Sequence, residues 1–140
     1  MRVILLILIG LSTLSLADFT RNGDIVTDNT TRLQWQDDTN ASAITKNWQE
    51  AIEYCEALSL GGYSDWRLPN LNELKSIVDR SKYDPAIKEG FVNTSSGNYW
   101  SSTTGEYDRG YAWIVNFRNG RVNDNGKGSS SYVRCVRDGQ

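Results

Sequence analysis

The sequence predicts a single α+β domain, and two observations indicate this class. Helical and strand-like patterns are segregated along the chain: a hairpin pattern comes first, two stretches of helical spacing follow, and alternating strands make up the rest. The length of 140 residues suits one domain rather than two. We therefore expect two helices packed against a mostly antiparallel sheet.

The first seventeen residues are typical of a secretory signal peptide. Arg2 supplies a positive start, residues 3–11 are almost entirely apolar, and small residues at Ser15 and Ala17 fit a cleavage site. The alternative is an uncleaved membrane anchor, but the apolar run is shorter than the roughly 20 residues that a span needs. We therefore expect export to the periplasm or the exterior, with residues 18–140 as the single domain and no stable membrane span.

An N-terminal hairpin comes next. Residues 25–27 form a short strand pattern, Asp28-Asn29-Thr30 has turn chemistry, and residues 32–35 alternate as the return strand. Residues 36–45 are predicted to be a polar loop.

The first helix is expected to begin after Asn47, whose side chain can cap the first turn, with Glu50 three residues later in a capping-box pattern. Apolar residues then recur at intervals of three or four, which predicts one buried face. We expect Gly61-Gly62 to end this helix, because glycine tolerates the positive φ of a helix C-terminus.

The second helix repeats the same signal, with Asn70 as the cap and Glu73 three residues on. Pro69 fixes the entry into it. The residues of its predicted buried face are Leu71, Leu74, Ile77 and Val78. Residues 81–98 lack a regular period and are predicted to form a loop with at most one helical turn.

Strand patterns then resume, and we expect strands at 99–103, at 111–117, from Val122 onward, and at 132–137. Within the second of these, Trp113 and Val115 fall on the same face. The dipeptide Asn119-Gly120 predicts a hairpin turn between the second and third strands. Residues 123–131 are rich in Gly, Ser and Asn and are predicted to form a loop.

The chain has two cysteines, Cys55 and Cys135. An even number in an exported chain indicates one disulfide, and two free thiols are the alternative. A bridge across 80 residues of sequence would tie the first helix to the last strand and restrict the unfolded chain by about 4 kcal/mol.

Composition excludes several classes of function. The chain has no histidine, so neither a Ser-His-Asp nor a Cys-His nucleophile system nor a histidine-ligated metal is available. The formal net charge of −2 is too small and too mixed to indicate a nucleic-acid partner. We expect no enzymatic activity, no cofactor and no metal.

The stretch GGYSDWRLPN, residues 61–70, has two interpretations. A tryptophan beside an arginine could form a platform for a sugar or an anion. We favour a structural clamp made of Trp66, Arg67, Pro69 and Asn70, in which the indole fills the core and the guanidinium pairs with a carboxylate or backbone carbonyls.

An aromatic and basic rim surrounds the later strands and is the predicted ligand surface. Its residues are Tyr107, Arg109, Tyr111, Arg118, Arg121 and Lys127. Loops on a rigid scaffold are where binding residues concentrate. The alternative is a solvated edge whose arginines discourage strand-to-strand association.

Two other acidic stretches are weaker candidates. Residues 123–128, NDNGKG, contain a single carboxylate where a calcium loop needs several, so a turn is expected. The adjacent pair Asp37-Asp38 is poorly placed to act across a glycosidic bond.

A set of motifs also carries a family resemblance. They are VTDNTTRLQWQ (26–36), NWQEAIEYCEAL (47–58), GGYSDWRLPNLNEL (61–74), YWSST (99–103), AWIVNF (112–117) with NG (119–120), and VRCVR (133–137). Together they resemble the C-terminal domain family of the Legionella collagen-like protein over residues 19–138. Arg32 and Gln34 depart from the Gly and Met that this family is expected to have.

The resemblance implies a C-type-lectin-like fold, related also to formylglycine-generating enzymes, in a bacterial extracytoplasmic protein. It implies a disulfide between the first helix and the final strand. The family's namesake binds sulfated glycans, but this chain lacks the Gly-X-Y repeat of a collagen-like stalk. The calcium-ligand sequences of C-type lectins and the closely spaced cysteines of formylglycine-generating enzymes are also absent.

The resulting hypothesis is an exported, non-enzymatic binding domain that recognises a glycan or a surface protein through the loops between its later strands. The alternative is a structural or assembly component of the cell envelope without a small ligand. The sequence leaves the oligomeric state open.

Overall fold

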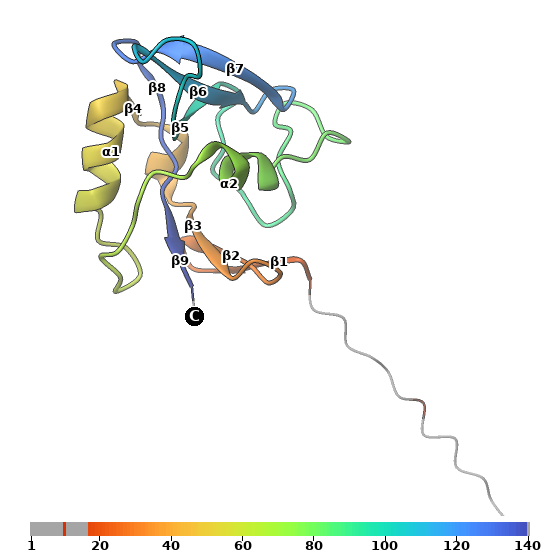
Figure 1. The fold of residues 1–140 in the computed structure, drawn as a ribbon. Coiled ribbons are helices and arrows are strands. Elements are labelled where there is room, and N and C mark those ends of the chain that lie inside the picture. Colours follow the sequence, from red (N-terminus) through yellow and green to blue (C-terminus); the bar gives the residue numbers. More distant parts are fainter. Residues whose placement is uncertain (1–9, 11–16, 140) are drawn as a thin grey trace, which may run out of the picture.

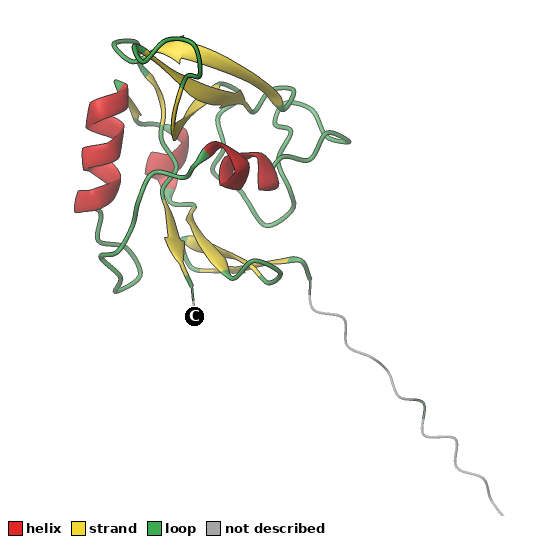
Figure 2. Cartoon of the chain, viewed as in Figure 1, coloured by secondary structure: helices red, strands yellow, loops and turns green. Residues whose placement is uncertain are grey.

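The computed structural model describes residue 10 and residues 17–139, and it is an α+β fold with two α-helices, mostly antiparallel strands and one disulfide, as predicted (Figures 1 and 2). The predicted signal peptide lies outside the described residues, apart from Gly10 and Ala17. No helix in the described part is long and apolar enough to cross a membrane.

Four strands form a sheet at the bottom of Figure 1, in the order β1-β2-β3-β9, with every pair antiparallel. The strands are β1 (Phe19–Asn22), β2 (Ile25–Asp28), β3 (Leu33–Gln36) and β9 (Val136–Asp138). The predicted hairpin is therefore β2–β3, and β1 adds a second hairpin that the polar sequence FTRN did not indicate. Between β2 and β3, the Asp28 carboxylate accepts hydrogen bonds from the backbone N–H groups of Thr30 and Thr31, and Arg32 takes a positive φ of 69°.

Five strands form a second sheet at the top of Figure 1, in the order β4-β8-β5-β6-β7. They are β4 (Thr45–Lys46), β8 (Ser131–Tyr132), β5 (Asn98–Thr104), β6 (Tyr111–Asn116) and β7 (Arg121–Gly126). The hairpin β6–β7 turns through the predicted Asn119-Gly120, where Gly120 has a φ of 80°. Residues 123–126, expected to be loop, belong to β7 and pair with residues 111–114 of β6.

The predicted last strand is divided between the two sheets. Its first part is β8, which pairs with β4 and β5, and its second part is β9, which pairs with β3. Residues 133–135 cross from one sheet to the other, and Figure 1 shows this dark blue segment running from top to bottom. The C-terminal segment therefore joins the two sheets.

Two α-helices and one short 3-10 helix complete the fold. α1 (Trp48–Ala57) begins after its Asn47 cap but ends before the glycines, because Leu58 already has extended backbone geometry. Gly61 and Gly62 instead make the tight turn of a small bridge between Leu60 and Tyr63. α2 (Leu71–Ser76) has the predicted capping box with Asn70 and Glu73, and the 3-10 helix η1 (Thr39–Ser42) lies in the segment predicted to be loop.

The core consists of two clusters on opposite faces of the five-stranded sheet. Alternation along β6 places Ala112 and Ile114 on the face that α1 covers, in a cluster with Trp100 and Trp66. Val115 and Phe117 lie on the other face. There they pack with Tyr99, with Leu74 of α2 and with Trp35 of the four-stranded sheet. The second cluster therefore fills the space between the two sheets.

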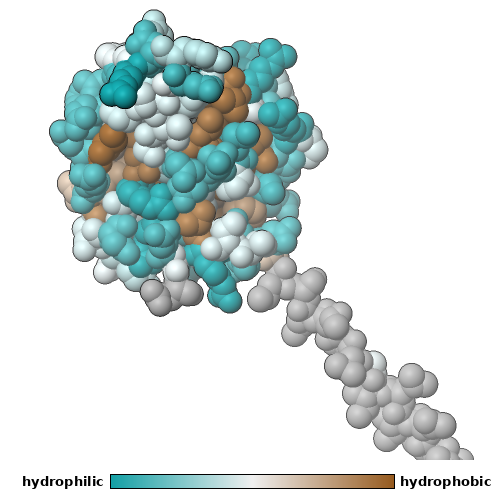
Figure 3. Space-filling view, in the orientation of Figure 1, coloured by the Kyte–Doolittle hydropathy of each residue, from teal (hydrophilic) through white to brown (hydrophobic). Residues whose placement is uncertain are grey.

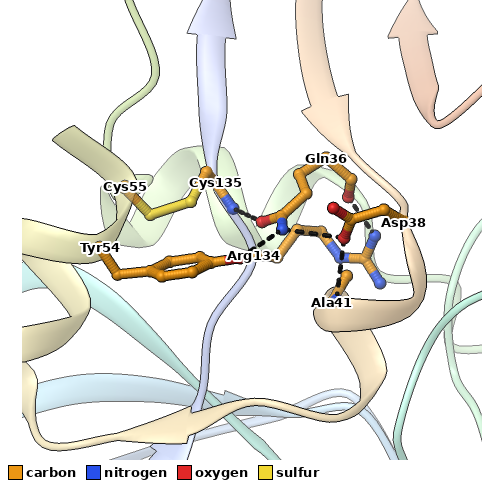
Figure 4. Close-up of a disulfide and its surroundings, with 7 residues drawn as sticks. All are labelled: Gln36, Asp38, Ala41, Tyr54, Cys55, Arg134 and Cys135. Carbon is orange, nitrogen blue, oxygen red and sulfur yellow. Dashed lines mark hydrogen bonds between the residues drawn. A yellow bond between two sulfur atoms is a disulfide. The ribbon is translucent and has the colours of Figure 1, made fainter. Parts of the chain in front are cut away.

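The disulfide Cys55–Cys135 is confirmed and fully buried. Figure 4 shows the buried side chain of Gln36 beside it. The Gln36 Oε1 accepts a hydrogen bond from the backbone N–H of Cys135, and its Nε2 donates to Tyr54 and to Asp38. One amide thus ties the end of β3 to α1, to η1 and to the crossing segment.

Candidate functional site

The stretch between the two helices is held by polar contacts on both sides. Trp66 is 2% exposed, and its Nε1 donates to the carbonyl of Tyr63 at 3.1 Å. The guanidinium of Arg67 binds both carboxylate oxygens of Glu73, at 2.6 and 2.7 Å, and also Asp138 at 2.8 Å. The Arg67 side chain therefore joins α2, through Glu73, to the end of the four-stranded sheet, through Asp138.

The backbone of this stretch is equally engaged. Arg67 exchanges two backbone hydrogen bonds of 2.8 Å with Val136, and the carbonyl of Pro69 accepts one of 2.8 Å from Ser102. The Asn70 side chain accepts from the backbone N–H of Glu73 and so caps α2. A ligand at the partly exposed Arg67 guanidinium would have to compete with Glu73 and Asp138 for its N–H donors.

The pKa shifts of Arg67 and Glu73 follow from the geometry of their ion pair. Burial acts to raise the pKa of Glu73, but the hydrogen bonds from Arg67 and from the Asn70 backbone, with the charge of Arg67, outweigh it and hold that pKa below its usual value. The hydrogen bonds that Arg67 donates to Glu73 raise the pKa of Arg67, so both groups are charged near neutral pH.

The six residues of the predicted ligand surface do not form one surface. Tyr107, Arg109 and Tyr111 lie at one end of the β6–β7 hairpin, whereas Arg118 and Arg121 lie at its turn. The length of β6 separates the two groups, which is about 17 Å at about 3.3 Å per residue.

At the turn, Arg118 already has an aromatic partner. Its Nε donates to the hydroxyl of Tyr83 at 2.8 Å, and its guanidinium lies 5.6 Å from the centre of that ring. Arg121 is exposed and begins β7. This end therefore offers one engaged and one solvated arginine.

Lys127 lies at the same end of the hairpin as Tyr111, but on the side of α1. Its Nζ is 3.9 Å from the centre of the Trp48 ring and donates to Thr104 at 3.0 Å. Its backbone N–H donates to the carbonyl of Gly110. Lys127 therefore fastens the end of β7 to α1 and to the loop after β5.

Three aromatic side chains at this end of the hairpin are fully or partly exposed, and we call this end the aromatic end. They are Tyr107, Tyr111 and Trp113. Tyr107 is 95% exposed in the loop between β5 and β6, and Tyr111 is 43% exposed. Trp113 follows Tyr111 on the same face of β6 and is partly exposed. Further along that face, α2 and its neighbours bury Val115 and Phe117, so the aromatic end is the part of the face that α2 leaves open.

Trp113 is the site residue that sequence reasoning missed. Alternation correctly places it on the face of Val115, and that face is apolar. Only the tertiary position of α2 decides where burial stops. The available signal was the place of Trp113 near the open end of its strand, next to Tyr111.

The five tryptophans differ in what their indole N–H groups contact. Those of Trp48, Trp66 and Trp100 donate to backbone carbonyls. That of Trp35 is buried without a partner. The Nε1 of Trp113 is not among the buried unpaired atoms and has no partner within the described chain. It is the indole donor that remains available to a ligand.

The neighbours of the aromatic end on β7 are Asp124 and Gly126. Asp124 lies directly opposite Trp113, and Gly126 lies opposite Tyr111. Residues paired in this way have Cβ atoms about 5 Å apart on the same face. Asp124 is exposed and forms no ion pair with the described residues, and Gly126 has no side chain to cover the tyrosine.

The surroundings are mixed in charge rather than basic. Glu106 and Asp108 flank Tyr107 in the same loop as Arg109, and Asp124 adds a further carboxylate. Figure 3 shows the general pattern on one face of the molecule, where hydrophilic residues dominate and hydrophobic ones form separate patches. The predicted basic rim is thus offset by acidic neighbours.

The acidic pair Asp37-Asp38 is taken up by internal contacts. The buried Asp37 carboxylate pairs with Arg21 and with Arg134, and it accepts backbone hydrogen bonds from Val92 and Asn93. Asp38 caps η1. Within residues 17–139, no three His, Cys, Asp or Glu side chains converge in a way that could hold a metal ion.

A polar hollow of about 390 Å³ lies elsewhere, between the β1–β2 turn and the loop after α1. Tyr63 forms part of its wall, and the Arg137 guanidinium stacks 3.6 Å from the centre of that ring. Arg137 also binds Asp65, which lowers the pKa of that carboxyl, and Gln34. Two residues of the hollow's wall, Tyr63 and Gln34, are therefore already engaged by Arg137.

No curated protein is significantly similar to the chain. The family model of the Lcl C-terminal domain matches residues 24–137. The match takes in both helices, the five-stranded sheet with the aromatic end, and the four-stranded sheet apart from β1 and the last residue of β9. The chain therefore belongs to the Lcl C-terminal domain family.

Proposed function

We propose that this protein is an exported, non-enzymatic binding domain that recognises a glycan, free or on a surface protein, through its aromatic end. The observation that carries the proposal is the exposure of Tyr111 beside a partly exposed Trp113 on β6, a strand that pairs on both sides, with the exposed Tyr107 in the preceding loop. Tyrosine and tryptophan present large contact areas with few rotatable bonds, which suits recognition. The rigid strand β6 fixes the spacing of Tyr111 and Trp113.

Export is part of the proposal and rests on two features. The N-terminal residues have the pattern of a signal peptide with a cut after Ala17. A buried disulfide is typical of proteins that fold outside the cytosol. Because β1 begins at Phe19, removal of the leader would leave the four-stranded sheet intact.

A C-type-lectin-like fold is the finer assignment that we propose. In favour of it, the disulfide links the first helix to the C-terminal segment, and that segment passes between two sheets. Fold kinship alone does not establish function, so the binding proposal rests on the aromatic end.

The experiment compares two double variants of the full-length protein, purified after export from a bacterial host, on a glycan array. Tyr107→Ala/Tyr111→Ala removes exposed rings of the aromatic end. Arg118→Ala/Arg121→Ala is the matched control at the opposite end of the same hairpin. The array is read at two salt concentrations, with and without EDTA, and the mass of the exported protein shows whether it begins at Asp18.

We expect the wild type and the arginine variant to bind the same glycans, and the tyrosine variant to lose at least tenfold in affinity. Loss of binding in the arginine variant alone would move the site to the hairpin turn. No binding by folded wild-type protein would contradict glycan recognition and favour a structural or assembly role in the cell envelope.

A further inference from the structure

We infer that the aromatic end selects an uncharged sugar ring, with Tyr111 and Trp113 as the stacking surface and Asp124 as the acceptor for its hydroxyl groups. This inference rests on the proposed function and narrows it to a class of ligand. It also assigns a role in specificity to Asp124, which the proposed function does not use.

The stacking surface follows from the pairing of β6 with β7. Tyr111 and Trp113 are two residues apart on one face, so their Cβ atoms are about 7 Å apart. This spacing is comparable to the length of one or two sugar rings. The face of an aromatic ring is electron-rich and attracts the polarised C–H groups of a sugar. Gly126, opposite Tyr111, leaves the tyrosine ring accessible on the β7 side.

Hydrogen-bonding groups of both kinds adjoin that surface. The Trp113 Nε1 is an unused donor, and the Tyr111 hydroxyl can donate or accept. The Asp124 carboxylate accepts only, and its neighbours in the described chain do not use it. A sugar hydroxyl is both donor and acceptor, so it can satisfy either group. Hydrogen bonds to an ionised carboxylate are stronger than neutral ones.

The charge of Asp124 decides the ligand class. It lies directly across from Trp113, so a sulfate or carboxylate on a stacked sugar would approach a like charge. Lys127 is bound to Trp48 and Thr104 on the α1 side, and Arg118 is bound to Tyr83 at the far end. Arg109, the other basic residue at this end, shares its loop with the carboxylates Glu106 and Asp108. An uncharged ring meets no such repulsion.

The test uses the exported full-length protein and two sets of probes of equal length. The neutral set contains tetramers of glucose, galactose, mannose and N-acetylglucosamine, and the anionic set contains a sulfated and a uronic-acid tetramer. Asp124→Asn removes the charge but keeps the shape. Glu56→Gln, which neutralises an exposed carboxylate on α1, is the matched control. Tyr111→Ala removes the ring and Tyr111→Phe keeps it.

We expect a neutral tetramer to bind the wild type with little dependence on salt. Asp124→Asn should weaken that binding about tenfold and strengthen binding of the sulfated tetramer about threefold. Glu56→Gln should change neither. Tyr111→Ala should cost about tenfold, and Tyr111→Phe much less.

Tighter binding of both anionic tetramers than of every neutral one, unchanged by Asp124→Asn, would overturn this inference and leave glycan recognition standing. Failure of both sets to bind folded protein would overturn glycan recognition itself.

Discussion

Arg67 and Glu73 show how a single pair of side chains can hold distant parts of this domain together. The bidentate pair lies between α2 and Asp138 of β9, and the backbone of Arg67 bonds to the same strand. The planar guanidinium suits this geometry because it presents two parallel donors to the carboxylate. Its exposure is partial, so its contribution to stability lies below that of a fully buried pair.

The lowered pKa of Glu73 predicts an acid-dependent loss of stability. Its folded-state pKa lies below the ordinary value of 4.5, so its contribution is complete above about pH 4.5 and is lost as the pH falls through the folded-state pKa. Glu73→Gln should therefore be less stable at pH 7 and should lose less stability between pH 4.5 and pH 3.

Thermal melts of the wild type and of Glu73→Gln at several pH values would check this difference. Glu53→Gln, on the exposed surface of α1, serves as the control because its carboxylate contacts only a neighbouring glutamine. Parallel pH profiles for the wild type and Glu73→Gln would show that the pair contributes nothing measurable.

The exposed tyrosines and the engaged arginines differ in how far sequence could predict them. Tyr107 and Tyr111 are predicted from residue type and from their place in, or directly after, the loop before a strand, which are local properties. That Arg118 would be bound to Tyr83 depends on a contact across 35 residues of sequence, which no local pattern encodes. The role of Trp113 likewise depends on where α2 stops covering its face.

At the scale of the element, capping signals predicted helix starts well because they act within four residues. Asn47 and Asn70 both cap their helices as expected. The predicted end of α1 is wrong because a glycine pair is compatible with two structures: a helix C-terminus or a separate tight turn. Here Gly61 helps to make the turn with a φ of 63°, and a Cβ at this position would clash with the side chain of Ile25.

The capping box of α2 predicts a measurable cost for its loss. Asn70→Ala removes the acceptor for the Glu73 backbone N–H, and we expect the free energy of unfolding to fall by about 1 kcal/mol. Urea denaturation of the variant and the wild type would measure this. Asn70→Ser, which keeps a capping oxygen, should restore most of the loss, and equal stability of Asn70→Ala and wild type would contradict the proposed cap.

At the scale of the whole molecule, the C-terminal segment connects the two sheets and carries the disulfide. The periodicity of residues 132–137 predicts one continuous strand. In the structure this segment contributes β8 to the five-stranded sheet and β9 to the four-stranded sheet. The sequence predicted the α+β class and the cysteine pairing because both follow from order and count. It did not predict the division of the strand, because that depends on where the sheets lie relative to each other.

Loss of the disulfide should destabilise the domain strongly. The bridge closes a loop of 80 residues, so Cys55→Ser/Cys135→Ser should lower the free energy of unfolding by about 4 kcal/mol and the Tm by about 15 °C. Calorimetry of the exported wild type and double variant would measure both. Two titratable thiols in the unfolded wild type, without reductant, would show that the bridge had not formed.

The most direct measurement of the central proposal is the indole region of a two-dimensional ¹H–¹⁵N NMR spectrum of the exported protein during titration with the neutral tetramers. The five tryptophans each give one indole signal, and the signal that is missing from the spectrum of Trp113→Phe is that of Trp113. We expect the Trp113 signal to shift on binding, while those of Trp66 and Trp100, bonded within the core, stay in place. A bound sugar that leaves the Trp113 signal unmoved and shifts another would contradict recognition at the aromatic end.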